Sequence, residues 1–481
     1  MIVIPTPSDS QESITSRLAR FAIETDGNFL TSRVIDAAKL MFLDTIGIMV
    51  RGAGHPAGEA AIRLALHDGG RATATIIGHG ERTSTPVAAF VNGVSAHALE
   101  YDDNTQRVGH VSVCLVPGCM AVAEETGATG RQMLEAFALG FEITSRVAKG
   151  LRPYLIDNGW HPIGIVGGQG VAVAASRLFG LDVMKTRMAM GIMASSGGGV
   201  RKNVGSMGKA FHVGHGVRAG VFAALLAREG FTVDPDIIEG GEGSAEGHQR
   251  FGLADTFNGI GRYRLNLMVE GLGQEPLEVE RNTTMVRMHP GSTAPGAAID
   301  GMIELAKSGV WKAGDVAEIV LECTPQCLAI APYPEPSDEH RAKFCLPYTM
   351  AVAFADRAVG LEQYSNARRQ DPEVLSLMKR VKVTLPEDLK HHRGQWGEGG
   401  VNWGESRLTV RFNDGRVLQR ACSHAKGWPE DPATWDDLME KFTQCVEPVL
   451  GAAQLREAAD MIAKLETLER VNDLAAVLCP R

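Results

Sequence analysis

The stretch GWHPIGIVGGQGVAVAASRLFGL, residues 159–181, is an apolar run in which glycines recur. Four of its glycines lie close together, at Gly164, Gly167, Gly168 and Gly170. They match the glycine pattern of a dinucleotide-binding loop only superficially, because no clear strand precedes them and the next acid, Asp182, begins another helix. Small residues let helix backbones approach closely, so the stretch predicts a tightly packed helix inside a helical core.

Helical patterning continues on both sides of this stretch. From about residue 11 to residue 230, apolar residues recur at helical spacing between Gly-rich breaks. One short segment, residues 71–78 (RATATIIG), is expected to be a strand. The expected helices span residues 34–50, 86–99, 111–126, 130–149, 167–179, 182–195 and 209–229.

The pattern changes near residue 260, where alternating and β-branched segments begin. Residues 407–421 (RLTVRFNDGRVLQRA) predict a β-hairpin, because Asn-Asp-Gly favours a tight turn between alternating strands. Further strands are expected at residues 263–269, 316–323 and 381–385. Helices are expected at residues 295–307, 343–358, 434–450 and 453–468.

This helix–mixed–helix order predicts a mainly α protein with an α+β part. We expect one large, discontinuous all-helical domain, with a smaller α+β domain of about 140 residues inserted late in the chain. Residues 391–406 (HHRGQWGEGGVNWGES) form a Gly/Trp-rich segment, interpreted as a surface loop. Whether His391 and His392 in this loop reach a site is left open.

The composition is that of a globular chain of 481 residues, 44% hydrophobic and 22% charged, long enough for two or three domains. A net charge of −9 without a basic stripe argues against a nucleic-acid partner. The N-terminus lacks the pattern of a secretory signal, and no apolar stretch approaches the ~20 residues of a membrane span. We therefore expect a cytoplasmic protein without a membrane partner.

The eight cysteines are scattered and form no CxxC pair. Their spacing argues against a zinc ribbon, an iron–sulfur cluster and a disulfide framework. The sequence also has no nucleophile elbow, P-loop, HExxH or EF-hand pattern. Any chemistry is therefore expected to depend on His, Lys, Arg and acidic side chains, with no metal and no cofactor.

The first of four polar clusters is HALEYDDN, residues 97–104, followed by His110. A helix that ends in acids, then a loop and a histidine before the next helix, is typical of a binding site, because a helix N-terminus attracts anions. The alternative is that Asp102 and Asp103 only cap or solvate a helix end.

Each of the other three clusters also has a structural interpretation. His161 precedes the glycine-rich helix and could be a structural histidine. Lys209 and His212 are three residues apart on one helical face and could point into a cavity or lie at the surface. Arg287, in a Pro/Gly-rich loop, could bind a carboxylate in fork geometry or be an ordinary surface arginine.

Together, the order of these clusters and their helical context resemble the MmgE/PrpD family over nearly the whole chain. The resemblance is carried by six stretches: FLDTIGIMVRG (42–52), AAFVNGVSAHALEYDD (88–103), LEAFALGFEITSRVA (134–148), the stretch at 159–181, KAFHVGHGVRAGVFAALLAREGFT (209–232) and AKFCLPYTMAVAFAD (342–356).

The resemblance implies a helical domain at residues 1–278 and 426–481, with an α+β lid domain at 279–425. It also implies a homodimer, a site between the two domains and no cofactor. The catalytic groups then fall on His110, His161 and Lys209. The substrate-binding groups fall on Glu100, Asp102, Asp103, Asn104, His212 and Arg287.

Three of these positions depart from the pattern of the family. Glu100 stands where aspartate is usual, Asn104 where threonine is common, and Arg287 where the lid usually has lysine. All three are expected to recognise carboxylates of the substrate. The substrate is therefore expected to differ from that of a standard 2-methylcitrate dehydratase.

The family contains 2-methylcitrate dehydratases, cis-aconitate decarboxylases and iminodisuccinate epimerases. The resemblance therefore implies proton abstraction next to a carboxylate of a small polycarboxylic acid. Lys209, Arg287 and His110 would hold the carboxylates and stabilise the developing enediolate, with His161 or Lys209 as the base. Dehydration is ranked first and epimerisation second; decarboxylation and, more remotely, non-catalytic carboxylate binding are the further alternatives.

Overall fold

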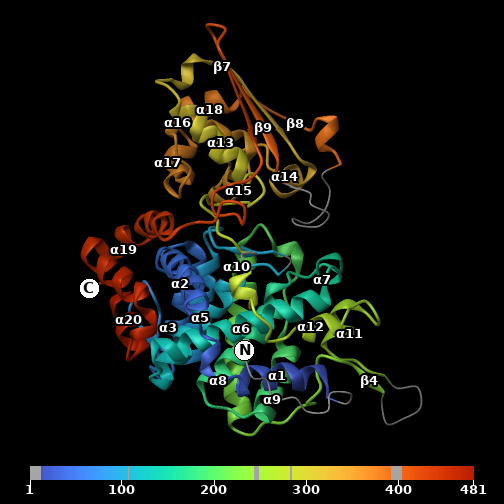
Figure 1. Cartoon of the computed structure of the whole chain (residues 1–481). Coiled ribbons are helices and arrows are strands. Elements are labelled where there is room, and N and C mark those ends of the chain that lie inside the picture. Colours follow the sequence, from blue (N-terminus) through green and yellow to red (C-terminus); the bar gives the residue numbers. More distant parts are fainter. Residues whose placement is uncertain (1–11, 107, 243–248, 282–283, 392–403) are drawn as a thin grey trace. The chain divides into compact units, whose positions relative to one another are not determined.

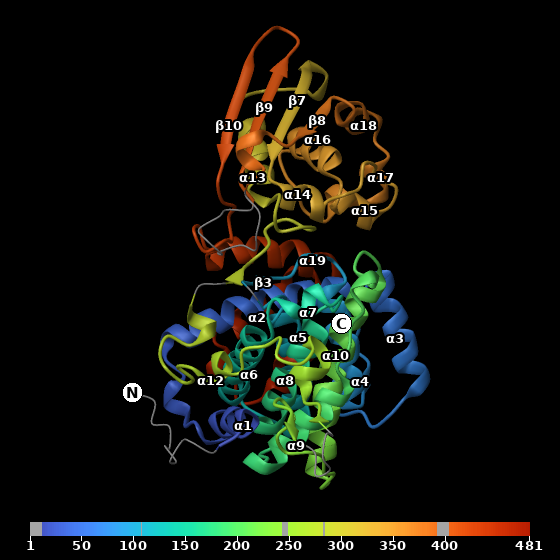
Figure 2. The same ribbon diagram turned by 90° about the vertical axis from the view of Figure 1, so that its right-hand side faces the viewer.

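The computed structural model describes residues 12–106, 108–242, 249–281, 284–391 and 404–481. The chain forms two compact units, one made of residues 1–283 and 435–481 and the other of residues 284–434. Figures 1 and 2 show the elements of both units from two directions. The fold is mainly α with an α+β part, which confirms the predicted fold class.

Helices dominate the first unit, and side chains at their N-termini define where several of them begin. Thr129 and Gln132 form a capping box at the start of α6, and Asp182 caps α9. The main helices are α1 (Ile14–Glu24), α2 (Ser32–Gly52), α3 (Pro56–Asp68), α4 (Thr85–His97), α5 (Ser112–Thr126), α6 (Gly130–Leu151), α8 (Ile163–Leu178), α9 (Val183–Ser196), α10 (Met207–Arg228), α19 (Trp435–Ala463) and α20 (Val471–Val477).

Helix α8 is the glycine-rich stretch, and it lies in the core of this unit. All its residues from Ile163 to Ser176 are buried. A Cβ atom on Gly170 would lie 2.6 Å from the carbonyl oxygen of Gly140 on α6, and one on Gly164 would lie 3.3 Å from that of His212 on α10. The glycines therefore permit close helix packing, as predicted, and do not form a dinucleotide-binding loop.

Helix α10 is long and apolar enough to cross a membrane by length and composition alone. However, 67% of its apolar window is buried inside the fold. It packs against α4, α8 and α9. We therefore interpret α10 as a core helix.

Two segments differ from the predicted strands. Residues 263–269 contain the short helix α12 (Asn266–Val269), because the apolar side chain of Met268 packs against Gly150 of α6. Residues 71–78 contain only the two-residue strand β1 (Ala74–Thr75), paired with β2 (Arg82–Thr83). The backbone N–H and hydroxyl of Thr75 instead bind the carboxylate of Glu124. Short apolar runs do not reveal such tertiary partners.

The second unit contains a four-stranded sheet (Figure 2). Its order is β10 (Val417–Cys422), β9 (Ser406–Phe412), β7 (Val316–Cys323) and β8 (Val381–Thr384). β9 is antiparallel to both β10 and β7, whereas β7 and β8 are parallel. The predicted hairpin and the predicted strands at 316–323 and 381–385 are thus confirmed.

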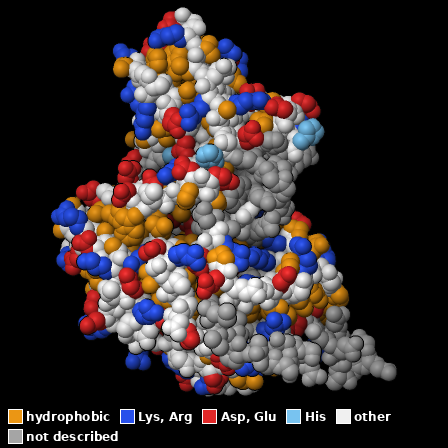
Figure 3. All heavy atoms as spheres, in the orientation of Figure 1, with side chains coloured by type: hydrophobic (Ala, Val, Ile, Leu, Met, Phe, Trp, Pro, Cys, Tyr) orange, Lys and Arg blue, Asp and Glu red, His pale blue; other side chains and the backbone are white. Residues whose placement is uncertain are grey.

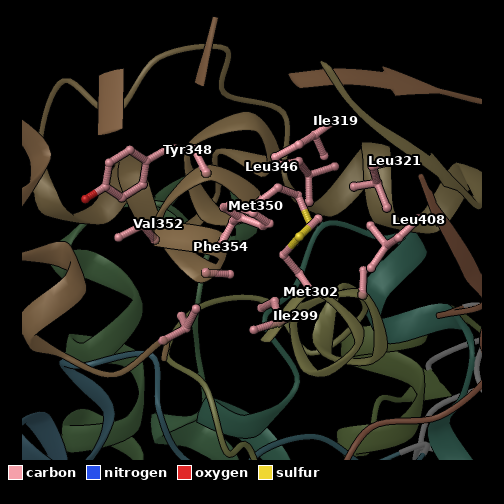
Figure 4. Packing of buried hydrophobic residues seen from close by; sticks show 14 of the residues in the cluster. Ile299, Met302, Ile319, Leu321, Leu346, Tyr348, Met350, Val352, Phe354 and Leu408 are labelled. Atoms are coloured by element: carbon pink, nitrogen blue, oxygen red, sulfur yellow. The ribbon is translucent and has the colours of Figure 1, made fainter. Parts of the chain in front are cut away.

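Helices cover one face of this sheet and enclose a hydrophobic core. In Figure 4, Ile319, Leu321 and Leu408 from the strands lie close to Met302 of α13 and Leu346 of α16. Alternate residues of β7 and β9 are buried, as expected for a sheet covered on one face. The helices are α13 (Gly296–Lys307), α14 (Pro325–Ile330), α15 (Glu339–Lys343), α16 (Leu346–Asp356), α17 (Asn366–Arg369) and α18 (Pro372–Met378).

The chain then returns to the first unit through α19 and α20. The two helices predicted at 434–450 and 453–468 form the single element α19, which is interrupted at Gly451, where φ is 77°. The predicted Gly/Trp-rich loop falls mostly on residues 392–403, outside the described residues. Other short elements are β3 (Asn104–Thr105), β4 (Gly241–Glu242), β5 (Gln249–Arg250), β6 (Thr284–Met285), α7 (Tyr154–Asp157) and α11 (Leu253–Asn258).

Candidate active site

One carboxylate in the turn after α4 holds two histidines. Oδ1 of Asp102 lies 3.0 Å from Nδ1 of His97, and its Oδ2 lies 2.7 Å from Nδ1 of His110. All three side chains are buried. α4 ends at His97, and His110 stands two residues before α5, so Asp102 joins the ends of two core helices.

These contacts determine which nitrogen of His110 carries the proton. Its Nδ1 also lies 2.8 Å from the backbone carbonyl oxygen of Asp103. Carbonyl and carboxylate oxygens only accept, so Nδ1 donates and Nε2 carries the lone pair of the neutral ring. The hydrogen-bond network therefore holds His110 in the tautomer whose basic nitrogen is Nε2.

Lys209 lies in the first turn of α10 and pairs with Glu100. Both side chains are buried. The backbone of Glu100 has φ of 55°, in the left-handed region that non-glycine residues seldom adopt. Residues held in this region are frequent at functional sites, where the surrounding structure compensates for the strain.

His161 precedes α8 and joins the same cluster. Its ring centre lies 6.0 Å from that of His97, with the two planes stacked at 19°, and 6.2 Å from that of His110. On the other side, its Nδ1 lies 3.2 Å from Nδ1 of His212 on α10. Four histidines from separate segments are therefore neighbours.

Burial keeps most of these imidazoles neutral. It lowers the pKa of His110 from 6.5 to about 4, even though the adjacent Asp102 carboxylate acts in the opposite direction. Burial, together with the charge of Lys209, places the pKa of His161 well below its usual value, and burial also lowers the pKa of His212. The cluster thus offers neutral imidazoles beside an ammonium group, an arrangement suited to proton transfer on an anion.

Asp103 points into the protein and accepts a hydrogen bond from the hydroxyl of Ser112. Burial, assisted by the nearby charges of Asp44 and Asp102, raises the pKa of this carboxyl to about 8. Asp103 is therefore mainly protonated at neutral pH, whereas its backbone carbonyl helps to orient His110.

A buried lysine from the C-terminal helix supports the turn that carries these acids. Nζ of Lys441 on α19 lies 2.7 Å from the carbonyl oxygen of Tyr101, 4.0 Å from the centre of its ring and 2.5 Å from Oδ1 of Asp44 on α2. The ion pair of Lys441 and Asp44 thus holds the turn between Glu100 and Asp103 through the carbonyl oxygen of Tyr101.

Two family models match the chain. The model described as the MmgE/PrpD N-terminal domain matches residues 16–250, and that of the MmgE/PrpD C-terminal domain matches residues 289–467. The chain belongs to the MmgE/PrpD family.

Relatives of this MmgE/PrpD protein include cis-aconitate decarboxylases from three organisms. The enzyme of Mus musculus is 24% identical, over 97% of this chain and 93% of the relative. That of Homo sapiens is 24% identical, over 97% and 95%, and that of Aspergillus terreus is 23% identical, over 98% and 97%. These relatives support an enzyme of the lyase class.

Most of the residues that the sequence predicts for the MmgE/PrpD site lie together in the first unit. They are Glu100, Asp102, Asp103, His110, His161, Lys209 and His212. Asn104 is half-buried in β3. Arg287 belongs to the second unit, where it is buried and donates to the carbonyl oxygen of Gly291 at 2.8 Å, so its contact with substrate stays a prediction.

The structure suggests a different role for one predicted substrate ligand. Because both oxygens of Asp102 contact histidines, we infer that this residue positions His97 and His110, and its contact with substrate stays a prediction. A cavity of about 590 Å³ elsewhere in this unit is lined in part by Arg177 and Glu135, which pair with each other, and includes none of the site residues.

Sequence reasoning included His97 in the first polar cluster without giving it a role, and it missed Lys441. His97 lies five residues before Asp102 at the end of an apolar helix, and the sequence does not show that the two side chains meet. Lys441 lies 340 residues from Tyr101, and no local pattern can connect two such distant residues. A positive residue on the apolar face of a late helix was the only signal that the sequence offered.

Proposed function

We propose that this protein is a cofactor-free lyase of a small polycarboxylic acid, and that it decarboxylates an aconitate-like tricarboxylate. The observation that carries this proposal is the buried group of neutral imidazoles beside Lys209, in which Asp102 fixes the tautomer of His110. Decarboxylation replaces dehydration as the first candidate because the relatives described above are cis-aconitate decarboxylases.

Decarboxylation of such an acid needs one proton and no oxidant or reductant. The bond to the leaving carboxylate breaks, and its electron pair shifts the double bond along the carbon chain. Negative charge then develops on the carbon next to a remaining carboxylate, and a proton adds to that carbon. The products are carbon dioxide and an unsaturated dicarboxylate. The ammonium of Lys209 stabilises the developing charge, and an imidazolium supplies the proton.

The negative charge of a bound substrate favours protonation of an imidazole in the cluster. A bound carboxylate within about 4–6 Å of an imidazole favours the charged ring and raises its pKa. His110 and His161 are each 8% exposed, whereas His97 is 1% exposed. We therefore assign proton delivery to His110 or His161, with Lys209 as the charge-stabilising group.

Dehydration is the second candidate, favoured by the neutral state of His110. A neutral imidazole can remove a proton from the carbon next to a carboxylate, after which hydroxide leaves with a proton from a second acid and an alkene forms. This reaction uses the same group of residues. The two lyase reactions are separated by their products, since one releases carbon dioxide and the other releases water.

The test is to incubate purified protein with citrate-like and aconitate-like acids in D₂O and to follow the mixture by NMR. The proposal predicts loss of carbon dioxide from an unsaturated tricarboxylate, with one deuterium in the product. A new alkene with loss of water from a hydroxy acid would support dehydration. Deuterium exchange without loss of mass would contradict a lyase and indicate an epimerase, and no change in any acid would contradict the proposal.

Lys209→Ala should lower turnover by about 10²–10⁴-fold or more, because it removes the group that stabilises developing charge. Circular dichroism should show the same helix content as the wild type. The matched control is Lys202→Ala, since Lys202 is exposed and lies outside the cluster. Turnover of Lys209→Ala equal to that of the control would remove Lys209 from the mechanism.

A further inference from the structure

Three of the buried histidines are arranged like the ligands of a metal ion. His97, His110 and His161 each offer one ring nitrogen, and these three atoms lie within 4.8 Å of one another. Zn–N bonds of about 2.0–2.1 Å in tetrahedral geometry place ligand nitrogens about 3.3 Å apart. The rings would therefore close by up to about 1.5 Å around an ion.

The surroundings of the cluster match those of a metal site. A histidine that binds a metal through one nitrogen usually donates its other N–H to a carboxylate or a carbonyl. Nδ1 of His97 and Nδ1 of His110 lie 3.0 and 2.7 Å from the oxygens of Asp102, which leaves the Nε2 atoms as the ligand atoms. Neither ring nitrogen of His97 makes a hydrogen bond within the described residues: Nδ1 has its contact with Asp102, and the buried Nε2 has no polar partner. An ion would satisfy this nitrogen.

The local charge also accommodates a cation. The ammonium of Lys209 is paired with the carboxylate of Glu100, and Asp102 adds a negative charge against two of the three rings. Three imidazoles leave one position of a tetrahedral ion open for water or a ligand. Imidazole donors suit zinc, cobalt, nickel and copper better than magnesium or calcium.

We propose that His97, His110 and His161 bind a divalent transition-metal ion, of the Zn²⁺ or Co²⁺ type, and that this ion and the substrate exclude each other. Exclusion follows because the ion occupies the nitrogens of His110 and His161 that act on the substrate. The exclusion rests on the function proposed above, whereas the binding of the ion does not.

Binding is tested by titrating Co²⁺ into tag-free, chelator-treated full-length protein and recording visible d–d absorption. We expect one ion per chain with the intense bands of a tetrahedral site. His97→Gln should weaken binding at least about tenfold, and Asp102→Asn by about 10–100-fold. His79→Gln is the control, because His79 is exposed. No stoichiometric binding, or equal affinity for His97→Gln and the control, would overturn the site.

X-ray absorption of the Zn²⁺-loaded wild type gives an answer that does not depend on any variant. Three imidazole ligands are expected, and a single imidazole or a sulfur ligand would overturn the site.

Mutual exclusion of the ion and the substrate is tested by measuring turnover at concentrations of free Zn²⁺ that are set by a metal buffer. Turnover should fall as the fraction of protein that binds Zn²⁺ rises, and it should return after the ion is removed by a chelator. Unchanged or increased turnover would overturn exclusion, and absence of any turnover would remove the proposed function and exclusion while leaving the Co²⁺ result valid.

Discussion

At the scale of single residues, one carboxylate determines how two imidazoles can act. The two oxygens of Asp102 lie 3.0 Å from Nδ1 of His97 and 2.7 Å from Nδ1 of His110, and the side chain is fully buried. A carboxylate can do this because both of its oxygens accept, whereas an amide offers one acceptor and one donor group. The shared carboxylate therefore positions both rings and, together with the backbone carbonyl of Asp103, fixes the tautomer of His110.

Asp102→Asn should lower kcat by about 10²–10⁴-fold with a smaller effect on KM, because one ring loses its acceptor and its basic nitrogen is no longer fixed. Steady-state kinetics on the substrate found by NMR measure this effect. Asp157→Asn, at an exposed position, is the control. A kcat within about threefold of the control would contradict the positioning role.

Asp103 makes folding stability depend on pH in a definite direction. Its folded pKa of about 8 lies above its ordinary value of 3.8, so the folded state holds this proton more strongly than the unfolded state. The stability contribution of the group is fully present below pH 3.8 and is lost as the pH rises through 8. His110 has the opposite effect on stability at lower pH. Its folded pKa of about 4 lies below its ordinary value of 6.5, so the unfolded state holds this proton more strongly and stability rises between pH 4 and 6.5.

Between pH 6.5 and 8, wild-type protein should lose about 1–2 kcal/mol of unfolding free energy relative to Asp103→Asn. The asparagine can still accept from Ser112 but does not titrate. Urea unfolding of both proteins at the two pH values measures the difference, and contributions of other groups cancel in the comparison. If the unfolding free energies of the two proteins changed equally with pH, Asp103 would not be the source of the predicted loss of stability.

The sequence predicted the residue types of this site better than their partners. His110, His161 and Lys209 could be located because each stands beside a helix start in a recognisable stretch. The bridging of two rings by Asp102 could not, because it depends on how the turn after α4 folds back on its own helix. The pairing of Lys209 with Glu100 depends in addition on a positive φ that glutamate seldom adopts.

At the scale of elements, the helical core depends on backbone contact between α8 and its neighbours. A Cβ on Gly170 would lie 1.9 Å from the hydroxyl of Thr144 and 2.6 Å from the carbonyl oxygen of Gly140, both on α6. Distances below 3 Å cannot be accommodated without moving the backbone, because cores are close-packed. The two helices α6 and α8 can thus lie this close together because Gly170 has no side chain.

Gly170→Ala should therefore destabilise the protein by about 1–3 kcal/mol, despite the higher helix propensity of alanine. Thermal or urea unfolding measures the change. Gly198→Ala is the control, since a Cβ there meets no atom within 4 Å and its φ is negative. A stabilised Gly170→Ala protein would show that the two helices are not in backbone contact.

Elements with long periodic patterns could be predicted from the sequence, and short ones could not. The helix α10 and the hairpin of β9 and β10 follow their predicted ranges within a few residues. The expected strand at 263–269 is helical instead, because its residues pack against α6 and pair with no strand. Seven residues of apolar alternation are too few to distinguish the two states.

At the scale of the whole molecule, the first unit contains both ends of the chain. Lys441 of the C-terminal helix α19 pairs with Asp44 of α2 and holds the carbonyl oxygen of Tyr101. The candidate site is thus built from residues near 44, 100, 161, 209 and 441, on both sides of the second unit in sequence. Charged side chains of both signs are interspersed over the face of the molecule in Figure 3.

Lys441→Met should destabilise the protein by about 3–5 kcal/mol, because it removes the cation of a buried ion pair. Asp44→Asn combined with Lys441→Met should recover part of this loss, since no buried charge is then left without its partner. Unfolding free energies of the two proteins are compared with that of Lys464→Met, at an exposed position on the chain after α19. Equal stability of all three would contradict a structural role for the pair.

The most direct test of the central claim, that buried neutral imidazoles receive a proton when a polycarboxylate binds, is calorimetry with a saturated, unreactive tricarboxylate at pH 6. The titration is performed in two buffers with different ionisation enthalpies. The account predicts unequal binding heats that correspond to net proton uptake, with uptake reduced in His110→Gln or His161→Gln. Equal heats in both buffers for the wild-type protein would contradict it.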